Sequence, residues 1–479
     1  MAPAVTERQG ASYECVPGCY DEAVAADGAV RPHYADVLAA LQALDLDALA
    51  LTMHTHLRWE GVRFGTGADP RVFAVDPVPR VLAADEWRPL AAGLAQRVRA
   101  LNRFLADVYG ACEIVEAGVI PARVIKTARL YEPLAAELPP PPGGVFACVA
   151  GLDVVRGADG RFLVLEDNLR TPSGLAYALA ARRVQRDAGA APPPSSLAEI
   201  DRAPALLGVA LRAADPHGAG DPAIAVLSDG PRNAAFYEHR RLADGLGVPL
   251  VTPEALELAG DRLYARSGDS GRQQLDVLYR RTDEDRLTAA DGRTLTPLGE
   301  LLVEPLRAGN LTCVNAFGAG IGDDKLVHAY VEEMIRYYLR EDPLLGSVPT
   351  HDLGPPGERA SALRRLPELV VKPRAGEGGR GVVVCPHADA DDIAAAEDAI
   401  RRGGHDLIAQ ETVSLSTHPT VIAGRLEPRH VDLRPFVICA AGDAPAVVPG
   451  GLTRVAFGAG ALVVNSSQSG GAKDTWVLC

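Results

Sequence analysis

The order of hydrophobic and polar positions divides the chain into separate elements. Apolar residues recur at helical spacing over residues 34–51 and 86–109, and a strand-like run over residues 71–82 separates the two. A proline- and glycine-rich loop at residues 139–144 precedes an apolar run over residues 144–157. A second β-prone run follows directly, so the pattern predicts a pair of strands.

A different pattern begins after residues 188–199, a linker-like segment rich in proline, alanine and serine. Strand-like and helix-like runs alternate from there, which is typical of a doubly wound α/β unit. The predicted strands are residues 223–229, 275–281 and 311–317, and the predicted helices are residues 233–247, 298–309 and 324–341.

These patterns predict a domain division for the whole chain. Residues 1–20 are expected to form a flexible arm, residues 21–200 a part that carries the strand pair, residues 205–350 the α/β domain, and residues 355–479 a strand-rich part. The length of 479 residues and the hydrophobic content of 47% fit two or three packed domains and exclude a disordered chain.

Charge and targeting signals narrow the expected partners. The net charge of -14 argues against nucleic acid, because phosphate backbones bind positive surfaces. The first 20 residues lack the pattern of a secretory signal, and no stretch of about 18 apolar residues occurs. We therefore expect a cytoplasmic protein that binds no membrane, with its eight scattered cysteines reduced.

Lysine is rare in this chain: among 48 basic residues only Lys126, Lys325, Lys372 and Lys473 are lysines. A guanidinium group does not replace a compact ammonium group at a tight phosphate site. Each retained lysine is therefore a candidate for a specific contact.

The predicted strand pair brings oxygen ligands together. An Asp-Gly pair at residues 159–160 predicts a two-residue type I′ turn, which places Asp153 opposite Glu166. Asn168 shares their face because side chains alternate along a strand. Two carboxylates and an amide oxygen suit Mg²⁺ whose coordination is completed by substrate phosphates. The alternative is a surface hairpin with solvated acids.

Residues 368–384 predict a strand that ends in Lys372, a glycine-rich loop over residues 376–381 and a second apolar strand. Glycines let backbone N–H groups approach phosphate oxygens, and the lysine adds a positive charge. The loop joins two strands, whereas Walker A and Rossmann loops lead into a helix. A second glycine cluster at residues 315–324 carries Asp323 where a dinucleotide motif requires glycine, which argues against such a site.

Further polar residues lie on the later predicted strands. Gln410 and Glu411 end one strand, where they could contact an adenine edge or a ribose, and Arg434 and Arg454 lie on two others. Arg170 points toward the metal face if the strand that carries Asn168 continues.

Together these motifs resemble the circularly permuted ATP-grasp family, type 2, over roughly residues 20–479. The matching phrases include "YDE", "LEDN", "DDK", "YRR", "GGLTR" and "SSQSGG…KDTW". Relative to ordinary ATP-grasp enzymes, the metal hairpin comes first, a pre-grasp-like domain second and the lysine loop last. The resemblance implies an α/β (α+β) circularly permuted ATP-grasp fold with an inserted doubly wound pre-ATP-grasp-like domain, distantly similar to the ATP-grasp domain of glutathionylspermidine synthase.

The resemblance and the motifs together assign roles for ATP and Mg²⁺ as cofactors. Asp153, Glu166 and Asn168 are the expected metal ligands, and Arg170, Arg454 and Lys473 the expected catalytic residues. Nucleotide binding is expected from Lys372, Gly376, Gly378, Gly379, Gly381, Gln410, Glu411 and Arg434. Substrate binding is expected from Ser173, Gly174, Asn233, Arg280, Arg281 and Lys325.

The resemblance implies an ADP-producing ligase that joins a small-molecule or peptide carboxylate to an amine through an acyl phosphate. Two alternatives stay open at this point. One is a phosphotransferase with the same ATP site, and the other is a nucleotide-binding scaffold without turnover. The complete set of Lys372, Asp153, Glu166 and Asn168 argues against the scaffold, which would not need it.

Overall fold

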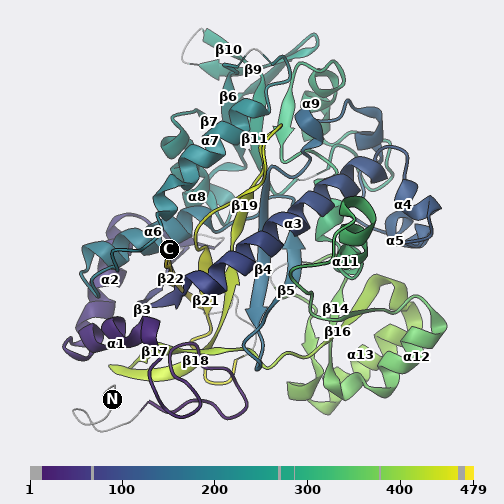
Figure 1. The fold of residues 1–479 in the computed structure, drawn as a ribbon. Helices are drawn as coiled ribbons and strands as arrows, with labels where there is room; N and C mark the ends of the chain where they lie inside the picture. The colour runs from purple at the N-terminus through teal and green to yellow at the C-terminus, as the bar shows by residue number, and fades with distance from the viewer. Residues whose placement is uncertain are drawn as a thin grey trace.

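A computed structural model gives the fold of the chain (Figure 1). It describes residues 13–65, 70–218, 220–267, 271–284, 286–376, 379–461 and 470–479. Within these ranges no single helix has the length and apolar content to cross a membrane. The sharply bent pair over residues 32–42 and 46–59 meets that measure only when its two helices are joined.

The central sheet combines strands from both ends of the chain. Its order is β20-β19-β4-β18-β21-β22-β3, with β5 paired to β4 and β17 paired to β18. β22 runs parallel to β3, so the last described strand lies beside one of the first. The strands are β3 (Val75–Leu82), β4 (Val149–Arg156), β5 (Phe162–Asn168), β17 (Thr417–Ile422), β18 (Arg425–Arg434), β19 (Phe436–Ile438), β20 (Ala446–Val447), β21 (Leu452–Val455) and β22 (Gly471–Val477).

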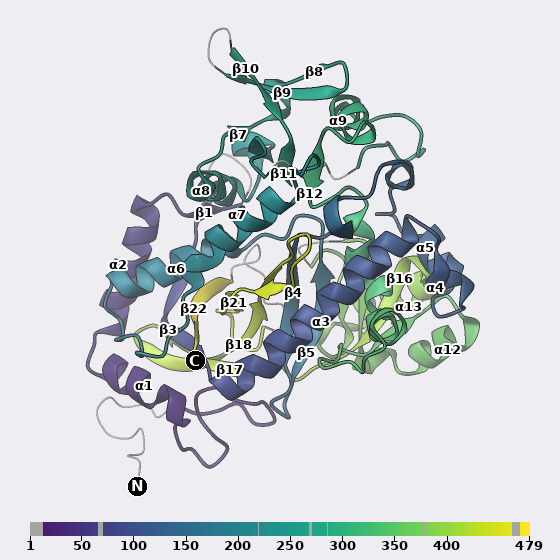
Figure 2. The same ribbon diagram turned by 45° about the horizontal axis from the view of Figure 1, so that its top comes forward.

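Helices cover both faces of this sheet (Figures 1 and 2). Val437 belongs to the core on the side of α3, and its neighbours Phe436 and Ile438 belong to the core on the side of α6. The helices of this part are α1 (Ala35–Gln42), α2 (Leu46–Trp59), α3 (Ala84–Val108), α4 (Glu113–Glu116), α5 (Ala122–Lys126) and α6 (Leu175–Asp187). A short ribbon of β1 (Arg63–Phe64) and β2 (Arg71–Val72) precedes β3.

The predicted strand pair is β4 and β5, and its register at the acidic residues is confirmed. Asp153 lies opposite Glu166, and Asn168 lies two residues further along the same face of β5. A bulge interrupts the pairing between Asp153 and Val154 and accommodates Leu165 as an extra residue on β5.

The predicted two-residue turn of this hairpin is wrong. A type I′ turn needs a positive φ at both central residues, but in this loop only Gly160 has one, at 80°. The Gly157 amide donates to the Arg161 carbonyl (2.9 Å), so the loop holds one residue more than predicted. The bulge at Leu165 offsets this extra residue, which is why the register at Asp153 is still correct.

The middle segment forms the predicted parallel sheet, in the order β12-β11-β6-β7. Its elements are α7 (Ala203–Ala213), β6 (Ile224–Ser228), α8 (Phe236–Leu246), β7 (Leu250–Val251), β11 (Val277–Arg281), α9 (Pro297–Arg307) and β12 (Thr312–Val314). An antiparallel ribbon of β8 (Leu256–Ala259), β9 (Arg262–Ser267) and β10 (Gly271–Leu275) extends from it at the top of Figure 1.

The single helix predicted over residues 324–341 is wrong. The segment divides into α10 (Lys325–His328), α11 (Val331–Met334) and a π-helical turn at Ile335–Leu339. Its apolar side chains, such as Leu326 and Met334, still pack in the core beside α3. The helical spacing of apolar residues therefore predicted which side chains are buried, but it did not predict that the helix is interrupted.

A third sheet carries the glycine-rich loop, in the order β13-β16-β14-β15. The loop lies between β14 and β15, as predicted, although β15 is short. The elements are β13 (Thr350–Asp352), α12 (Pro356–Arg364), β14 (Leu369–Pro373), β15 (Val383–Val384), α13 (Ala390–Gly403) and β16 (Leu407–Glu411).

The described part of the expected flexible arm packs against the sheet. The Tyr13 hydroxyl donates to Asp21 (2.5 Å), and the Tyr20 ring faces the guanidinium groups of Arg31 and Arg156 at 4.2 and 4.3 Å. Residues 1–12 lie outside the described residues.

Candidate functional site

A cavity of about 660 Å³ lies where the β4–β5 hairpin, the glycine-rich loop and the middle segment meet. It brings together most residues that the sequence singled out. The lining residues include Asp153, Glu166, Asn168, Arg170, Ser173, Gly174, Asn233, Arg281, Lys325, Lys372, Gly376, Gly379, Gln410, Glu411, Arg434 and Arg454. Among the described residues, Gly381, Arg280 and Lys473 do not line it, and Gly378 lies outside the described residues.

Asp153 is the most strongly held acid of the site. It is buried, and its carboxylate accepts from Arg434 Nε (2.6 Å), Arg434 Nη2 (2.9 Å) and Arg454 Nη2 (2.9 Å). Burial alone would raise the pKa of Asp153, but the two guanidinium groups hold it well below its ordinary value. The group is therefore anionic, as a metal ligand must be.

Glu166 and Asn168 present further oxygen atoms beside Asp153. Lys325 Nζ lies 3.3 Å from Glu166 Oε2, and the buried Nδ2 of Asn168 has no hydrogen-bond partner among the described residues. In the part of the chain that the structure describes, no three His, Cys, Asp or Glu side chains converge on one point. The donor set fits Mg²⁺ that shares its coordination with phosphate oxygens, and it is too small for a metal cage made by protein alone.

Lys372 faces these acids from β14. Its side chain is buried, and Nζ donates to Gln410 Oε1 (2.6 Å). Desolvation lowers the pKa of Lys372 to about 8, with the charge of Lys325 adding to the effect and Glu166 opposing it. An anionic ligand in the cavity would therefore gain a nearby cation that has few other partners.

Residues 323–325, Asp-Asp-Lys, join the hairpin to the glycine-rich loop. Asp323 accepts from the backbone amide of Leu169 (2.6 Å) at the end of the hairpin. Lys325 Nζ contacts Glu166 and donates to the Gly376 carbonyl (2.8 Å) on the loop.

Asp324 forms the third link of this run. Its buried carboxylate accepts from Arg374 Nε (3.0 Å) and Nη2 (2.9 Å) at the base of the glycine-rich loop. Asp324 belongs to the phrase "DDK" noted in the sequence, but no role was expected for it. Two consecutive acids beside one of four lysines were the available signal.

The two polar residues at the end of β16 differ in their burial and in their partners. Gln410 is buried and also donates to Thr350 Oγ1 (2.9 Å). Glu411 is partly exposed, but it accepts two bonds from Arg365 (2.8 Å each) and contacts His351 Nε2 (2.7 Å). Arg365 lowers the pKa of Glu411. The negative charge of the Glu411 carboxylate is therefore already balanced by Arg365, before any ribose hydroxyl could bind it.

The loop after the hairpin, residues 170–174, is fixed on both sides. Arg434 Nη1 donates to the Ser173 carbonyl (3.2 Å), and Arg281 Nη1 donates to the Pro172 carbonyl (2.8 Å). The Gly174 amide donates to Glu238 Oε2 (2.8 Å), so the backbone N–H of this expected substrate-binding residue is already engaged within the protein. Sequence analysis missed Glu238, because no local motif marks a carboxylate that caps a distant helix.

Two predicted site residues lie elsewhere. Lys473 is fully buried on β22, paired with Asp76 and donating to the Pro419 carbonyl (3.0 Å). Arg280 is buried against the Phe317 ring at 4.4 Å. Both charges are used inside the protein, so the geometry gives no support for a direct part in catalysis or substrate binding.

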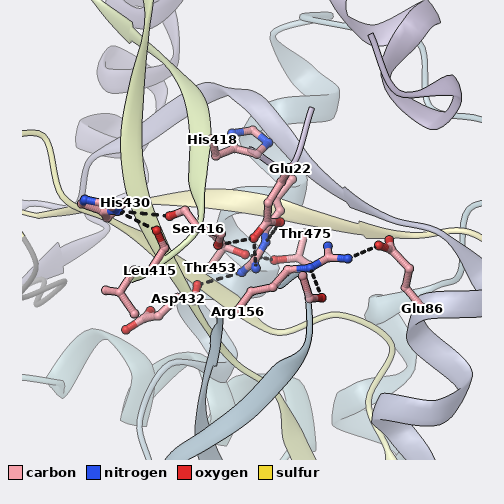
Figure 3. Close-up of polar contacts among 12 residues, drawn as sticks. Glu22, Glu86, Arg156, Leu415, Ser416, His418, His430, Asp432, Thr453 and Thr475 are labelled. Carbon is pink, nitrogen blue, oxygen red and sulfur yellow. Dashed lines mark hydrogen bonds and ion pairs between the residues drawn. The ribbon is translucent and has the colours of Figure 1, made fainter. Parts of the chain in front are cut away.

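A buried polar network around Glu22, Ser416 and Asp432 (Figure 3) extends to Arg454 through the Asp432 carboxylate. Glu22 accepts from Arg80 Nε and Nη2 (2.6 Å each) and from Ser416 Oγ (2.6 Å). Arg80 Nη1 donates to the Asp432 carbonyl (3.1 Å), and the Asp432 carboxylate accepts from Arg454 Nε (2.8 Å). The phrase "YDE" thus contributes to the fold around the site and not to the cavity wall.

Comparisons with known proteins agree with this geometry. A family model described as "Circularly permuted ATP-grasp type 2" matches residues 79–456. A protein of Frankia alni named "Putative glutamate--cysteine ligase 2-3" is 46% identical over 100% of this chain and 55% of its own length. The chain therefore spans about half the length of that relative.

Two shorter relatives match over most of their length. An uncharacterized protein of Mycobacterium tuberculosis is 42% identical over 96% of this chain and 84% of its own. One of Synechocystis sp. is 41% identical over 96% of this chain and 97% of its own. Among solved structures, a glutathione synthetase-like effector of Globodera pallida has a TM-score of 0.52 at 11% identity, covering 90% of this chain and 96% of that one.

Proposed function

The chain belongs to the circularly permuted ATP-grasp family, type 2, and we propose that it is an ATP-dependent ligase that joins a carboxylate to an amine. The expected family and fold class are confirmed by the match over residues 79–456 and by the glutathione synthetase-like neighbour. The activity, its substrates and its ADP-forming course are part of the proposal.

One observation carries the proposal: a single cavity joins the acidic hairpin to the lysine and glycine loop. Lys325 contacts Glu166 of the hairpin and the Gly376 carbonyl of the loop. Asp153, Glu166 and Lys372 line the same space. Oxygen ligands for a divalent cation and ammonium groups for phosphates therefore face one another, as phosphoryl transfer requires.

The chain's own residues would position the reactants. Asp153, Glu166 and Asn168 would hold Mg²⁺, which when bound neutralises phosphate charge during transfer. Lys372 on β14, and Lys325 between Glu166 and the Gly376 carbonyl, would hold phosphate oxygens beside these ligands. Gly379, whose φ is 74°, keeps the loop backbone in a conformation that side chains rarely adopt.

The proposed reaction has two balanced steps. A carboxylate oxygen attacks the terminal phosphorus of ATP, ADP leaves, and an acyl phosphate forms. The amine nitrogen then attacks the acyl carbon, inorganic phosphate leaves, and the amine loses a proton. Arg454, held in place by Asp432 and Asp153, lies where it could neutralise the transferring phosphoryl group, and Arg170 lines the same cavity.

The relatives' names do not decide the substrates. The name of the Frankia alni relative points to glutamate and cysteine, but this chain matches about half of that protein. We therefore propose only the classes: a small-molecule or peptide carboxylate and an amine.

The test uses hydroxylamine as a general nucleophile, because it traps acyl phosphates as hydroxamates. The protein is incubated with MgATP, pooled carboxylic acids and hydroxylamine. A ligase releases ADP, phosphate and hydroxamate in equal amounts. A stable phosphorylated product would instead indicate a phosphotransferase, and nucleotide binding without ADP release would indicate a scaffold.

A matched variant links this reaction to the hairpin. We expect Glu166→Gln to fold normally, because Glu166 is partly exposed, and to lose hydroxamate formation, because a metal ligand is removed. Glu341→Gln, at an exposed ion pair, is the control and should retain activity. Normal turnover by Glu166→Gln would refute the assignment of Glu166 to the metal.

A further inference from the structure

One group of cavity-lining residues is aromatic and was not expected from the sequence. Phe64 on β1, Phe73 before β3 and Tyr177 on α6 form what we call the aromatic wall. Ring centroids lie 4.7 Å apart for Phe73 and Tyr177 and 5.7 Å apart for Phe64 and Tyr177. Phe73 and Tyr177 are buried, whereas Phe64 is only half-buried.

The wall is fixed to its surroundings by backbone contacts. The Tyr177 hydroxyl donates to the Arg63 carbonyl (2.9 Å), and the Gly65 amide donates to the Ala234 carbonyl (3.1 Å). Ala234 lines the cavity as well. The wall is therefore a formed surface that joins the β1–β2 ribbon to the start of α8.

Charges beside the aromatic wall are already matched within the protein. Arg281 donates to Glu238 (2.7 Å), and both side chains are almost fully buried. Glu238 also accepts from the Gly174 and Ala176 amides (2.8 and 3.0 Å), so the N-terminus of α6 already holds a carboxylate. Asp283, an exposed acid that lines the cavity, accepts from Asn233 (2.8 Å).

His239 adds no charge to this part of the cavity. It lines the space and is buried, and its Nδ1 lies 2.8 Å from Ser228 Oγ. Desolvation, with Arg281 nearby, lowers its pKa to about 2, so the imidazole is neutral. A charged substrate group placed against this wall would lose hydration without gaining a counter-charge from the residues described around it.

The aromatic wall is close in sequence to the part of the cavity where Asp153 and Arg434 lie. Arg434 binds Asp153 and donates to the Ser173 carbonyl (3.2 Å). Tyr177 follows four residues later, on the first turn of α6. A substrate whose carboxylate lies beside Arg454 can therefore place its other end against the wall, because both line the same cavity.

We propose that the aromatic wall holds an uncharged apolar or aromatic side chain of the carboxylate substrate. This inference rests on the proposed ligase function and narrows its substrate class. A substrate of this class differs from one, such as glutamate, that carries a second carboxylate in its side chain.

The test compares carboxylic acids of matched shape in the hydroxylamine assay with MgATP. Leucine is compared with aspartate and asparagine, and methionine with glutamate and glutamine. We expect kcat/KM to be at least about tenfold higher for the apolar member of each set, because the wall offers contact area but no counter-charge. Equal or better turnover of aspartate or glutamate would overturn the inference, as would ATP binding with no turnover of either apolar acid.

Variants of the half-buried wall residue make the test local. Phe64→Glu should lower kcat/KM for leucine and methionine about tenfold or more while leaving the KM for ATP unchanged, and Phe64→Leu should retain most of the activity. Trp59→Glu, at an exposed aromatic residue outside the cavity, is the matched control. If Phe64→Glu folds and turns over apolar acids normally, the inference is wrong.

The two proposals fail in different ways. A protein that binds no nucleotide, as measured by calorimetry with MgAMP-PNP, would remove the proposed function and this inference with it. A protein that binds and hydrolyses ATP with charged acids would keep the proposed function and remove only the apolar substrate.

Discussion

At the scale of single residues, the site depends on cations that are poorly solvated. Lys372 is buried with Gln410 as its hydrogen-bond partner, and Lys325 lies between an acid and a carbonyl. Arg454 is held by Asp432 and Asp153. Such groups bind anions strongly, because the cost of removing their hydration has already been met in the folded state.

The first prediction concerns Lys372→Met. The affinity for MgAMP-PNP should fall about 10- to 100-fold, the range for a charge-assisted hydrogen bond. Stability without nucleotide should stay equal or rise, because methionine carries no buried charge. Titration calorimetry and chemical denaturation measure the two effects. Lys126→Met, at an exposed position on α5, is the control. Unchanged nucleotide affinity in Lys372→Met would remove this residue from the site.

The second prediction is the pH dependence of nucleotide binding. The pKa of Lys372 is lowered to about 8, so the ammonium group is charged below that pH and neutral above it. Affinity should therefore fall about tenfold between pH 7 and pH 9 if only the charged form binds. Lys372→Arg should bind more weakly but with a flatter profile, because arginine stays charged. A wild-type profile as flat as that of Lys372→Arg would contradict the assignment.

The rarity of lysine shows how far residue-level reasoning could go. It pointed to Lys372 and Lys325, which both line the cavity. It also pointed to Lys473, which the fold uses in a buried pair with Asp76. Sequence spacing cannot separate these cases, because the partner of a buried lysine comes from a distant strand.

At the scale of elements, the hairpin shows both what local pattern predicts and what it misses. The facing of Asp153 and Glu166 was predicted, but the turn is one residue longer and the bulge at Leu165 offsets it. The bulge also has a role, because Leu165 lines the cavity and its carbonyl accepts from Gln410 (3.3 Å). Alternation alone cannot locate a bulge, since bulges are set by packing against neighbouring strands.

The third prediction concerns the link between elements made by Asp324. Asp324→Asn leaves the buried guanidinium of Arg374 without its counter-charge and should lower the free energy of unfolding by about 3 kcal/mol. Glu341→Gln, at the exposed pair with Arg99, should cost less than about 1 kcal/mol. Urea denaturation measures both variants. A loss of less than about 1 kcal/mol in both variants would contradict a stabilising role of the buried Asp324–Arg374 pair.

At the scale of the whole molecule, the permuted order of the motifs could be predicted from the sequence, because each motif is made by neighbouring residues. The hairpin, the parallel domain and the glycine-rich loop each carry a short signature, and the family that the chain belongs to is described as circularly permuted. The central sheet closes this order in space, with β22 beside β3. The aromatic wall and Glu238 were not predictable, because their roles arise only where separate parts of the chain meet.

The central claim is that the acidic hairpin and the lysine loop hold one Mg-bound nucleotide between them. Hydrogen exchange with and without saturating MgAMP-PNP tests it most directly. Slower exchange is expected in two separate segments, β4–β5 and β14 with residues 323–328, and no change is expected in the β8–β10 ribbon. Protection confined to one of the two segments, at a nucleotide concentration shown to saturate binding, would contradict the claim.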